Sequence, residues 1–96
     1  MIINFKDRAT EELFHGIHSK LALRIPKDIW GVALRKLDML NAASEMGDLR
    51  VPPANRLESL KGDLKGLYSI RVNDRFRVVF RWSEHNAYDV RIEDYH

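Results

Sequence analysis

Residues 68–93 read YSIRVNDRFRVVFRWSEHNAYDVRIE, and this stretch decides the fold. Apolar and polar residues alternate along three runs, which two short polar segments separate. A period of two with β-branched and aromatic residues is typical of half-buried strands, and short connections make neighbouring strands antiparallel. The pattern therefore predicts an antiparallel meander with strands at 68–72, 75–82 and 88–93, turns at 73–74 and 84–86, and a further strand at 57–60.

The same alternation assigns side chains to the two faces of the sheet, because successive strand residues point to opposite sides. The apolar face is expected to carry Phe76, Val78, Phe80, Trp82, Tyr88, Val90 and Ile92. The opposite face is expected to carry Arg71, Arg75, Arg77, Arg81 and Arg91, with only Asp89 and Glu93 as acids. Since the guanidinium offers a rigid donor fork that suits phosphate oxygens, this second face predicts contact with a phosphate backbone.

The N-terminal half predicts a short strand followed by helices. Residues 1–5 resemble a strand that joins the sheet, and Asp7 can cap a helix that ends near Gly16. A second helix is expected from Pro26 to about residues 43–45, with its core positions spaced three or four residues apart. Residues 46–56 are expected to form a loop. The core positions of the second helix are Ile29, Ala33, Leu37 and Leu40, and Arg35, Lys36 and Asp38 are expected on its other side.

Length and composition limit the class of protein. A chain of 96 residues provides one modest core, so residues 1–96 are expected to form a single domain. The absence of cysteine excludes disulfides and thiolate metal sites. No apolar run approaches the roughly 20 residues of a membrane span, and the N-terminus does not resemble a signal peptide. We expect a cytoplasmic protein that does not bind membranes.

The positive charge is concentrated in one part of the chain. Residues 1–49 hold seven basic and seven acidic side chains, whereas residues 56–81 hold seven basic and only three acidic ones. Clustered charge matters more to a polyanion than the net charge does. A soluble surface is the alternative explanation of this excess.

The C-terminal residues and one lysine are the candidates for chemistry. The chain ends Glu93-Asp94-Tyr95-His96, and an imidazole with a pKa near 6.5 suits proton transfer at neutral pH. Tyr95 provides a ring that can stack on a base. Lys61 precedes Gly62, so a turn can direct its ammonium group. Read alone, a terminal histidine and a surface lysine are each more often without a function.

Taken together, several segments resemble the HigB group of toxins, which belongs to the RelE/ParE superfamily of bacterial toxin–antitoxin systems. The resemblance covers essentially the whole chain, and the stretch at 55–60 is closest to the GraT-like branch. The segments that carry it are Met1-Ile2-Ile3-Asn4-Phe5-Lys6, Leu60-Lys61-Gly62-Asp63, Tyr68-Ser69-Ile70-Arg71-Val72, Arg75-Phe76-Arg77, Glu93-Asp94-Tyr95-His96 and Asn55-Arg56-Leu57-Glu58-Ser59-Leu60.

The resemblance implies an α+β fold, in which two N-terminal helices pack on one face of a twisted antiparallel sheet. It implies cleavage of messenger RNA in the decoding site of the small ribosomal subunit. It also implies neutralisation by a helix-turn-helix antitoxin of the HigA type, through which alone the toxin would reach operator DNA.

Cleavage without a metal or another cofactor uses the 2′-hydroxyl of the substrate as nucleophile, and leaves a 2′,3′-cyclic phosphate and a 5′-hydroxyl. A base, an acid and cations are needed. His96 is expected to serve as base or acid, Lys61 and Arg77 to stabilise the phosphate, Tyr95 to orient the nucleotide, and Asp94 to adjust the loop or His96. The residues expected to bind RNA are Arg56, Arg71, Arg75, Arg81 and Arg91.

One position departs from the pattern of the family. Some relatives carry histidine three residues before this lysine, where the present chain has Glu58. A carboxylate repels a phosphate unless it is protonated or acts as a base. Either the activity is lower or the acid–base work rests on His96 alone.

Two other functions fit the same fold. A toxin of the ParE kind binds and inhibits DNA gyrase without cutting RNA, and a third class binds RNA without catalysis. Tyr95, His96 and Lys61 argue against the gyrase inhibitor, because a pure binder has no evident need for them.

Overall fold

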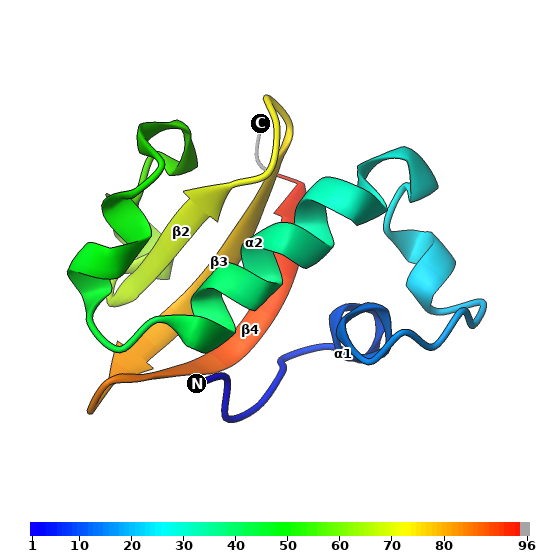
Figure 1. Cartoon of the computed structure of the whole chain (residues 1–96), viewed down its shortest axis with the longest axis horizontal. Helices are drawn as coiled ribbons and strands as arrows, with labels where there is room; N and C mark the ends of the chain where they lie inside the picture. Colours follow the sequence, from blue (N-terminus) through cyan, green and yellow to red (C-terminus); the bar gives the residue numbers. More distant parts are fainter. Residues whose placement is uncertain (95–96) are drawn as a thin grey trace.

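The computed structural model describes residues 1–94 and shows an α+β fold with one four-stranded sheet (Figure 1). The strands follow one another in the order β1-β2-β3-β4, and every neighbouring pair is antiparallel. The predicted meander and the additional strand at its front are therefore confirmed. The strands are β1 (Glu58–Ser59), β2 (Leu67–Arg71), β3 (Phe76–Ser83) and β4 (Asn86–Asp94).

Two α-helices precede the sheet, α1 (Arg8–Phe14) and α2 (Trp30–Ala42). The predicted cap of α1 is confirmed, because the Asp7 carboxylate accepts a hydrogen bond of 2.8 Å from the backbone N–H of Thr10. The second helix begins later than predicted, since the residues after Pro26 form a 3-10 turn, η2 (Lys27–Ile29), before α2 starts. No helix in the described part of the chain is both long and apolar enough to span a membrane.

Four further 3-10 turns connect these elements. The turn η1 (Ala22–Arg24) lies within the stretch 17–25, which the sequence left unassigned. The expected loop at 46–56 contains η3 (Met46–Arg50) and η4 (Pro53–Asn55), and η5 (Gly62–Leu64) joins β1 to β2. The loop at 46–56 is thus partly made of regular turns.

The N-terminal segment lies along β4 without forming a strand. Its only ladder contacts among the described residues are two isolated parallel bridges, Ile2 with Ala87 and Phe5 with Val90. Backbone N–H groups of Ile3 and Lys6 donate to the carbonyls of Ala87 and Val90 at 2.8 and 2.9 Å. The expectation that this segment joins the sheet is confirmed, whereas the predicted continuous strand is not formed.

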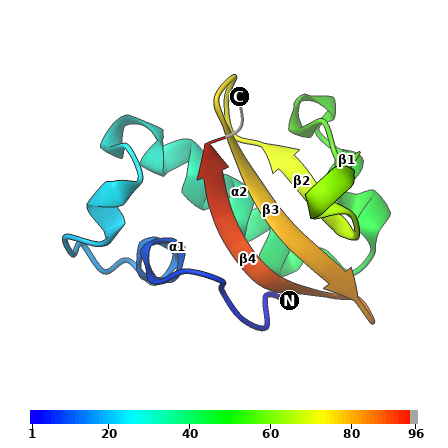
Figure 2. The same ribbon diagram turned by 180° about the vertical axis from the view of Figure 1, so that it is seen from behind.

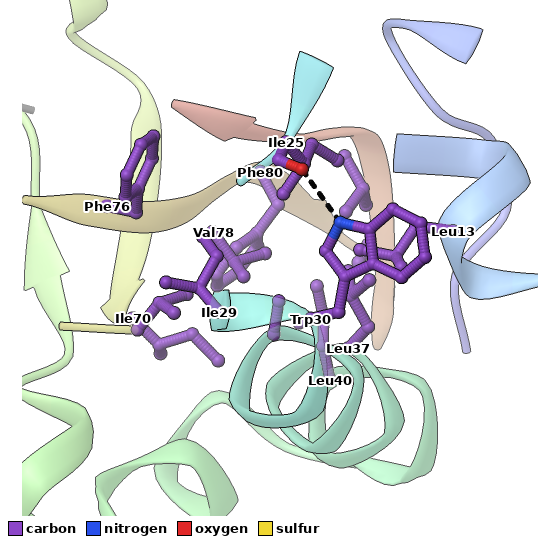
Figure 3. Close-up of a cluster of buried hydrophobic side chains, with 14 of the residues drawn as sticks. Leu13, Ile25, Ile29, Trp30, Leu37, Leu40, Ile70, Phe76, Val78 and Phe80 are labelled. Carbon is purple, nitrogen blue, oxygen red and sulfur yellow. Dashed lines mark hydrogen bonds between the residues drawn. The ribbon is translucent and has the colours of Figure 1, made fainter. Parts of the chain in front are cut away.

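The hydrophobic core lies between α2 and one face of the sheet (Figures 1 and 3). Leu37 and Leu40 of α2 meet Ile70, Val78 and Phe80 of the strands, and all five are fully buried. The indole N–H of Trp30 donates to the carbonyl of Ile25 at 2.8 Å, so this ring is buried without an unsatisfied donor (Figure 3).

The two helices do not share one face of the sheet as expected. Figures 1 and 2 show α2 lying across the sheet and α1 lying beside β4. Leu13 of α1 still joins the core. A second expectation is also wrong, since Lys36 of α2 is buried and not on the exposed side with Arg35 and Asp38.

A β-bulge in β4 changes which face its first residues point to. Val79 pairs with Arg91 but Arg81 pairs with Tyr88, so β4 has one extra residue at this point. Asp89 has a φ of 54°, as expected of a bulged residue. The bulge places Ala87 in the core and turns Tyr88 to the opposite face, where it lies against Arg81. The predicted apolar position of Tyr88 is therefore wrong.

Candidate functional site

The sheet face opposite α2 carries the candidate site, and we call it the arginine face. Its strand positions are Ser69 and Arg71 of β2, Arg77, Val79 and Arg81 of β3, and Tyr88, Arg91 and Glu93 of β4. Figure 2 views the molecule from this side, with α2 behind the sheet. Arg71, Arg77 and Glu93 lie side by side in one row across three strands. The alternation thus identified this face correctly apart from Tyr88 and from Arg75, which lies in the turn before β3 and not in the strand.

Arg77 lies in the middle of this face and is held on several sides. Its side chain is buried although the sequence suggested an exposed position. The Nε donates to the Ser69 hydroxyl at 2.6 Å, and one terminal nitrogen donates to the Arg56 carbonyl at 2.6 Å. The other terminal nitrogen lies 3.6 Å from the Glu58 carboxylate. These contacts fix the plane of the guanidinium before any ligand arrives.

Arg91 is the second buried arginine of the face. Its Nε donates to the Glu93 carboxylate at 3.0 Å, and a terminal nitrogen donates to the Asp89 carbonyl at 3.0 Å. Glu93 is also the cross-strand neighbour of Arg77, so the carboxylate that pairs with Arg91 belongs to the residue beside Arg77 in the sheet. This arrangement offsets the repulsion of two buried cations.

Arg81 lies at the far end of β3 and is half exposed. Its Nε is 3.5 Å from the Asp89 carboxylate, and its guanidinium carbon lies 4.5 Å from the centre of the Tyr88 ring. The Asn4 amide donates to the same carboxylate at 2.9 Å, and this bond together with Arg81 lowers the pKa of Asp89. The Asp89 carboxylate therefore stays ionised to a lower pH than an ordinary aspartate does.

The two remaining arginines lie at the other end of the sheet. Arg71 pairs with Asp74, which lies in the turn after β2. Arg75 forms a two-pronged contact with Asp94, at 2.9 and 2.7 Å, and this contact raises the pKa of Arg75. Asp94 thus forms an ion pair with Arg75, which directly precedes β3.

Every strand-associated arginine therefore has a carboxylate partner. The expectation that only Asp89 and Glu93 would accompany these arginines is wrong, because Glu58, Asp74 and Asp94 reach them from β1, a turn and the end of β4. Ion pairs of this kind reduce the positive potential that a phosphate meets. The sequence could not reveal them, since the partners lie outside the alternating runs.

Three cations near β1 have no such partner among residues 1–94. Arg56, Lys61 and Lys65 are exposed, and none makes an ion pair with a described residue. Arg56 has a φ of 44°, which turns its carbonyl towards Arg77. Lys61 precedes Gly62, whose φ of 65° favours glycine and begins the turn η5. The turn after Lys61 is present, and its role in directing the ammonium group stays a prediction.

Two polar residues that the sequence analysis missed support the site. Ser69 is fully buried and accepts from Arg77. Its position in an alternating strand, on the side of the arginines, was the available signal. Asn55 is also fully buried, accepts a short hydrogen bond from the Lys36 ammonium and directly precedes Arg56. No local pattern marks this pair.

Tyr95 and His96, two of the predicted catalytic residues, lie outside the described residues. Within residues 1–94, no three histidine, cysteine or acidic side chains gather in a way that would hold a metal ion. The described part of the predicted catalytic set thus consists of Lys61 on the turn after β1, Arg77 in β3 and Asp94 at the end of β4.

Comparison with known proteins gives one consistent family. The family model described as the RelE-like toxin of the type II toxin–antitoxin system HigB matches residues 3–96. Toxin HigB-1 of Vibrio cholerae is 44% identical over 82 residues, which cover 85% of this chain and 84% of that protein. Endoribonuclease HigB of Proteus vulgaris is 32% identical over the full length of both chains. An uncharacterised protein of Haemophilus influenzae is 38% identical over 79% of this chain and 71% of its own.

Proposed function

The chain belongs to the HigB-like toxins, the RelE-like toxins of type II toxin–antitoxin systems, and from this we propose that it is a cytoplasmic endoribonuclease that cuts messenger RNA on the ribosome. The name of the Proteus vulgaris relative supports the activity. Membership of a type II family implies an antitoxin partner, and we propose a helix-turn-helix protein of the HigA type.

The observation that carries this proposal is the fixed guanidinium of Arg77, which is held by the carbonyl of Arg56, an exposed cation without a carboxylate partner in the described chain. Arg77 is bound by Ser69 and by the carbonyl of Arg56, and Lys61 follows the two-residue strand β1. A hydrogen-bond donor that is already oriented needs little reorganisation when negative charge develops on the oxygens of the phosphate in the transition state. We propose that Arg77 and Lys61 stabilise the pentavalent phosphate and that Arg56 binds a neighbouring phosphate.

The reaction needs a proton acceptor at the 2′-hydroxyl and a donor at the departing 5′-oxygen. We propose that His96 fills one of these roles, that Tyr95 stacks on or hydrogen-bonds the nucleotide, and that Asp94, held by Arg75, steadies the chain that leads to them. The bond from phosphorus to the 5′-oxygen breaks as the 2′-oxygen attacks. The products are a 2′,3′-cyclic phosphate and a 5′-hydroxyl.

Glu58 has a defined place in this scheme. Its carboxylate lies 3.6 Å from Arg77 and half of its side chain is exposed. Ion pairing with Arg77 offsets its repulsion of a phosphate. We propose that Glu58 holds Arg77 in the free protein and yields to the substrate phosphate, and that the proton transfer assigned to a side chain is carried out by His96 and not by Glu58.

Cleavage of messenger RNA on purified ribosomes tests the proposal. We expect 5′-hydroxyl ends from the unaltered protein, and a fall of about 100-fold or more in rate for His96→Ala and for Lys61→Ala. Lys27→Ala is the matched control, since Lys27 is exposed on η2, and its rate should equal that of the unaltered protein. Thermal unfolding of each variant separates lost chemistry from lost folding.

Two outcomes would overturn this proposal. One is unaltered cleavage in both His96→Ala and Lys61→Ala. The other is intact RNA together with arrested DNA synthesis in cells, which would favour a gyrase inhibitor. The proposed catalytic groups are all protein side chains. Any cleavage of an RNA oligonucleotide that occurs without ribosomes should therefore be unchanged when EDTA removes divalent ions.

The remaining arginines, Arg71, Arg75, Arg81 and Arg91, are proposed to line the RNA path as ion-paired groups.

A further inference from the structure

A pocket of about 360 Å³ lies between α1, the turn η1 and the end of β4. Figure 2 shows these three elements on the α1 side of the molecule, away from β1 and β2. Ala9, Leu21, Ile25 and Ile92 contribute its apolar lining. Ile92 packs against the core on the α2 side of the sheet, so the pocket does not open on the arginine face.

Two exposed apolar side chains lie in and before the turn η1, which forms one wall of the pocket. Leu23, in the same 3-10 turn as Arg24, is 59% exposed, and Ile17, before this turn, is 51% exposed. Apolar side chains that are exposed in and before a turn that lines a pocket can contribute to a contact with another protein. The lining also holds Asp7, Arg8, Thr10 and Arg24. Of these, the Asp7 carboxylate and the Thr10 hydroxyl already accept hydrogen bonds from backbone N–H groups, the latter from Ile92 at 3.0 Å.

The charged rim of the pocket is mainly basic. Arg24 is exposed and makes no ion pair with a described residue, and neither does the nearby Lys20. Arg8 reaches Glu12 only at 3.8 Å, with 78% of its side chain exposed. The acid of the rim, Asp7, is engaged in capping α1. These cations complement a carboxylate on a partner.

The chemistry of the lining favours a protein over RNA as that partner. No aromatic ring lines the pocket among the described residues, so a base would find no stacking surface. An aliphatic side chain, in contrast, would fill the hollow and remove apolar surface from water.

We propose that this pocket is an anchor site for the antitoxin, which inserts an aliphatic side chain into it and places an acidic residue against Arg24. The proposal rests on the toxin–antitoxin assignment made above but not on the ribonuclease mechanism. It adds the location and chemistry of a contact, which family membership does not provide.

The test measures the dissociation constant between the toxin and the antitoxin encoded beside it, with both proteins purified in full. Arg24→Glu should raise this Kd by about tenfold or more at moderate salt, because it places a carboxylate against a carboxylate. Arg35→Glu is the matched control, since it makes the same reversal at an exposed position of α2 outside the pocket, and its Kd should stay within about twofold of the original. A second variant, Ala9→Met, fills the hollow and should also weaken binding.

RNA cleavage by the same variants separates the two proposals. Arg24→Glu should cleave as fast as the unaltered toxin and should resist neutralisation by the antitoxin. An unchanged Kd for Arg24→Glu would overturn the anchor site, and so would a loss of RNA cleavage with antitoxin binding intact. If the unaltered toxin cuts no RNA but Arg24→Glu still binds the antitoxin more weakly, the ribonuclease proposal fails and the anchor site stands.

Discussion

Lys36 and Asn55 form a polar pair inside a core that is otherwise apolar on this side. The Lys36 ammonium donates to the Asn55 side-chain carbonyl, and the Asn55 amide donates to the backbone carbonyl of Leu49 at 3.2 Å. No carboxylate pairs with this lysine among residues 1–94. Since Asn55 directly precedes Arg56, the pair ties α2 to the segment whose carbonyl holds Arg77.

Asn55→Ala should lower the free energy of unfolding by about 2–4 kcal/mol, because it leaves a buried ammonium and a buried carbonyl without their partners. Urea unfolding measures this change. Asn86→Ala is the control, since the Asn86 amide makes one exposed contact with the Glu84 carbonyl, and it should cost less than about 1 kcal/mol. Equal costs for the two variants would contradict the burial of the pair.

The protonation of Lys36 should make stability depend on pH. Desolvation, together with Arg35 and Arg71, lowers its pKa in the folded protein below 10.5. Between that lowered value and 10.5 the unfolded chain holds a proton that the folded chain has released, so the free energy of unfolding rises with pH across this window. Below the lowered pKa both states are protonated and the slope vanishes.

The difference between the unaltered protein and Lys36→Met isolates this effect, because other groups that titrate at high pH cancel. Urea unfolding at several alkaline pH values should show the unaltered protein gaining stability relative to Lys36→Met as pH rises. A difference that is flat or falls with pH would show that Lys36 is not the shifted group.

At the scale of elements, the bulge in β4 joins three parts of the chain. Asp89 has a φ of 54°, its carboxylate accepts from the Asn4 amide, and its own backbone N–H donates to the Asn4 side chain at 2.9 Å. The same carboxylate pairs with Arg81. The bulge therefore fastens the N-terminal segment to the sheet and turns Tyr88 onto the arginine face.

Substitutions at Asp89 should rank by backbone strain and lost contacts. Asp89→Ala should lower the free energy of unfolding by about 1–2 kcal/mol, since alanine disfavours a positive φ and loses both partners. Asp89→Asn should cost less, because asparagine tolerates this φ and still accepts from Asn4. Asp89→Gly should lie between them.

Thermal or urea unfolding of the three variants provides this ranking. Asp74→Ala is the control, because the Asp74 side chain is 98% exposed in its pair with Arg71 and should change stability little. If alanine were tolerated as well as asparagine, the bulge would not depend on this residue.

On the scale of the whole molecule, the distribution of ion pairs decides how its positive charge is used. The arginines of the sheet are paired, whereas Arg56 and Lys61, which lie before and after β1, are exposed and make no ion pair in the described chain. A cation without a partner neutralises a phosphate and releases a counterion, whereas a paired one must first give up its carboxylate. The two classes should therefore differ in their salt dependence.

The His96→Ala variant, which should leave the RNA uncut, should bind RNA more weakly as the salt concentration rises. Arg56→Gln and Lys61→Gln should each reduce the slope of log affinity against log salt by about 1. Arg81→Gln, which removes a cation paired with Asp89, should reduce it by clearly less. Fluorescence anisotropy with a short RNA measures the slopes, and equal effects of Arg81 and Lys61 would show that pairing does not matter.

Much of the fold could be predicted from local pattern. Alternation over 68–93 indicated the three long strands, their antiparallel order and the arginine face, because a period of two depends only on neighbouring residues. Asp7 indicated the start of α1 by its own hydrogen-bonding chemistry. Lys61 and Arg77 were identified by type and by resemblance, and their catalytic roles remain predictions.

Other features depended on contacts between distant residues, and only the tertiary structure decided them. The bulge is held by Asn4, 85 positions from Asp89, and Arg77 is held by a carbonyl 21 positions away. Burial of Lys36 and pairing of the arginines likewise need partners that no local period brings into view. The sequence by itself determined strands, caps and the charge of one face. Packing determined which of those charges are neutralised, because an ion pair depends on distance in space and not on separation along the chain.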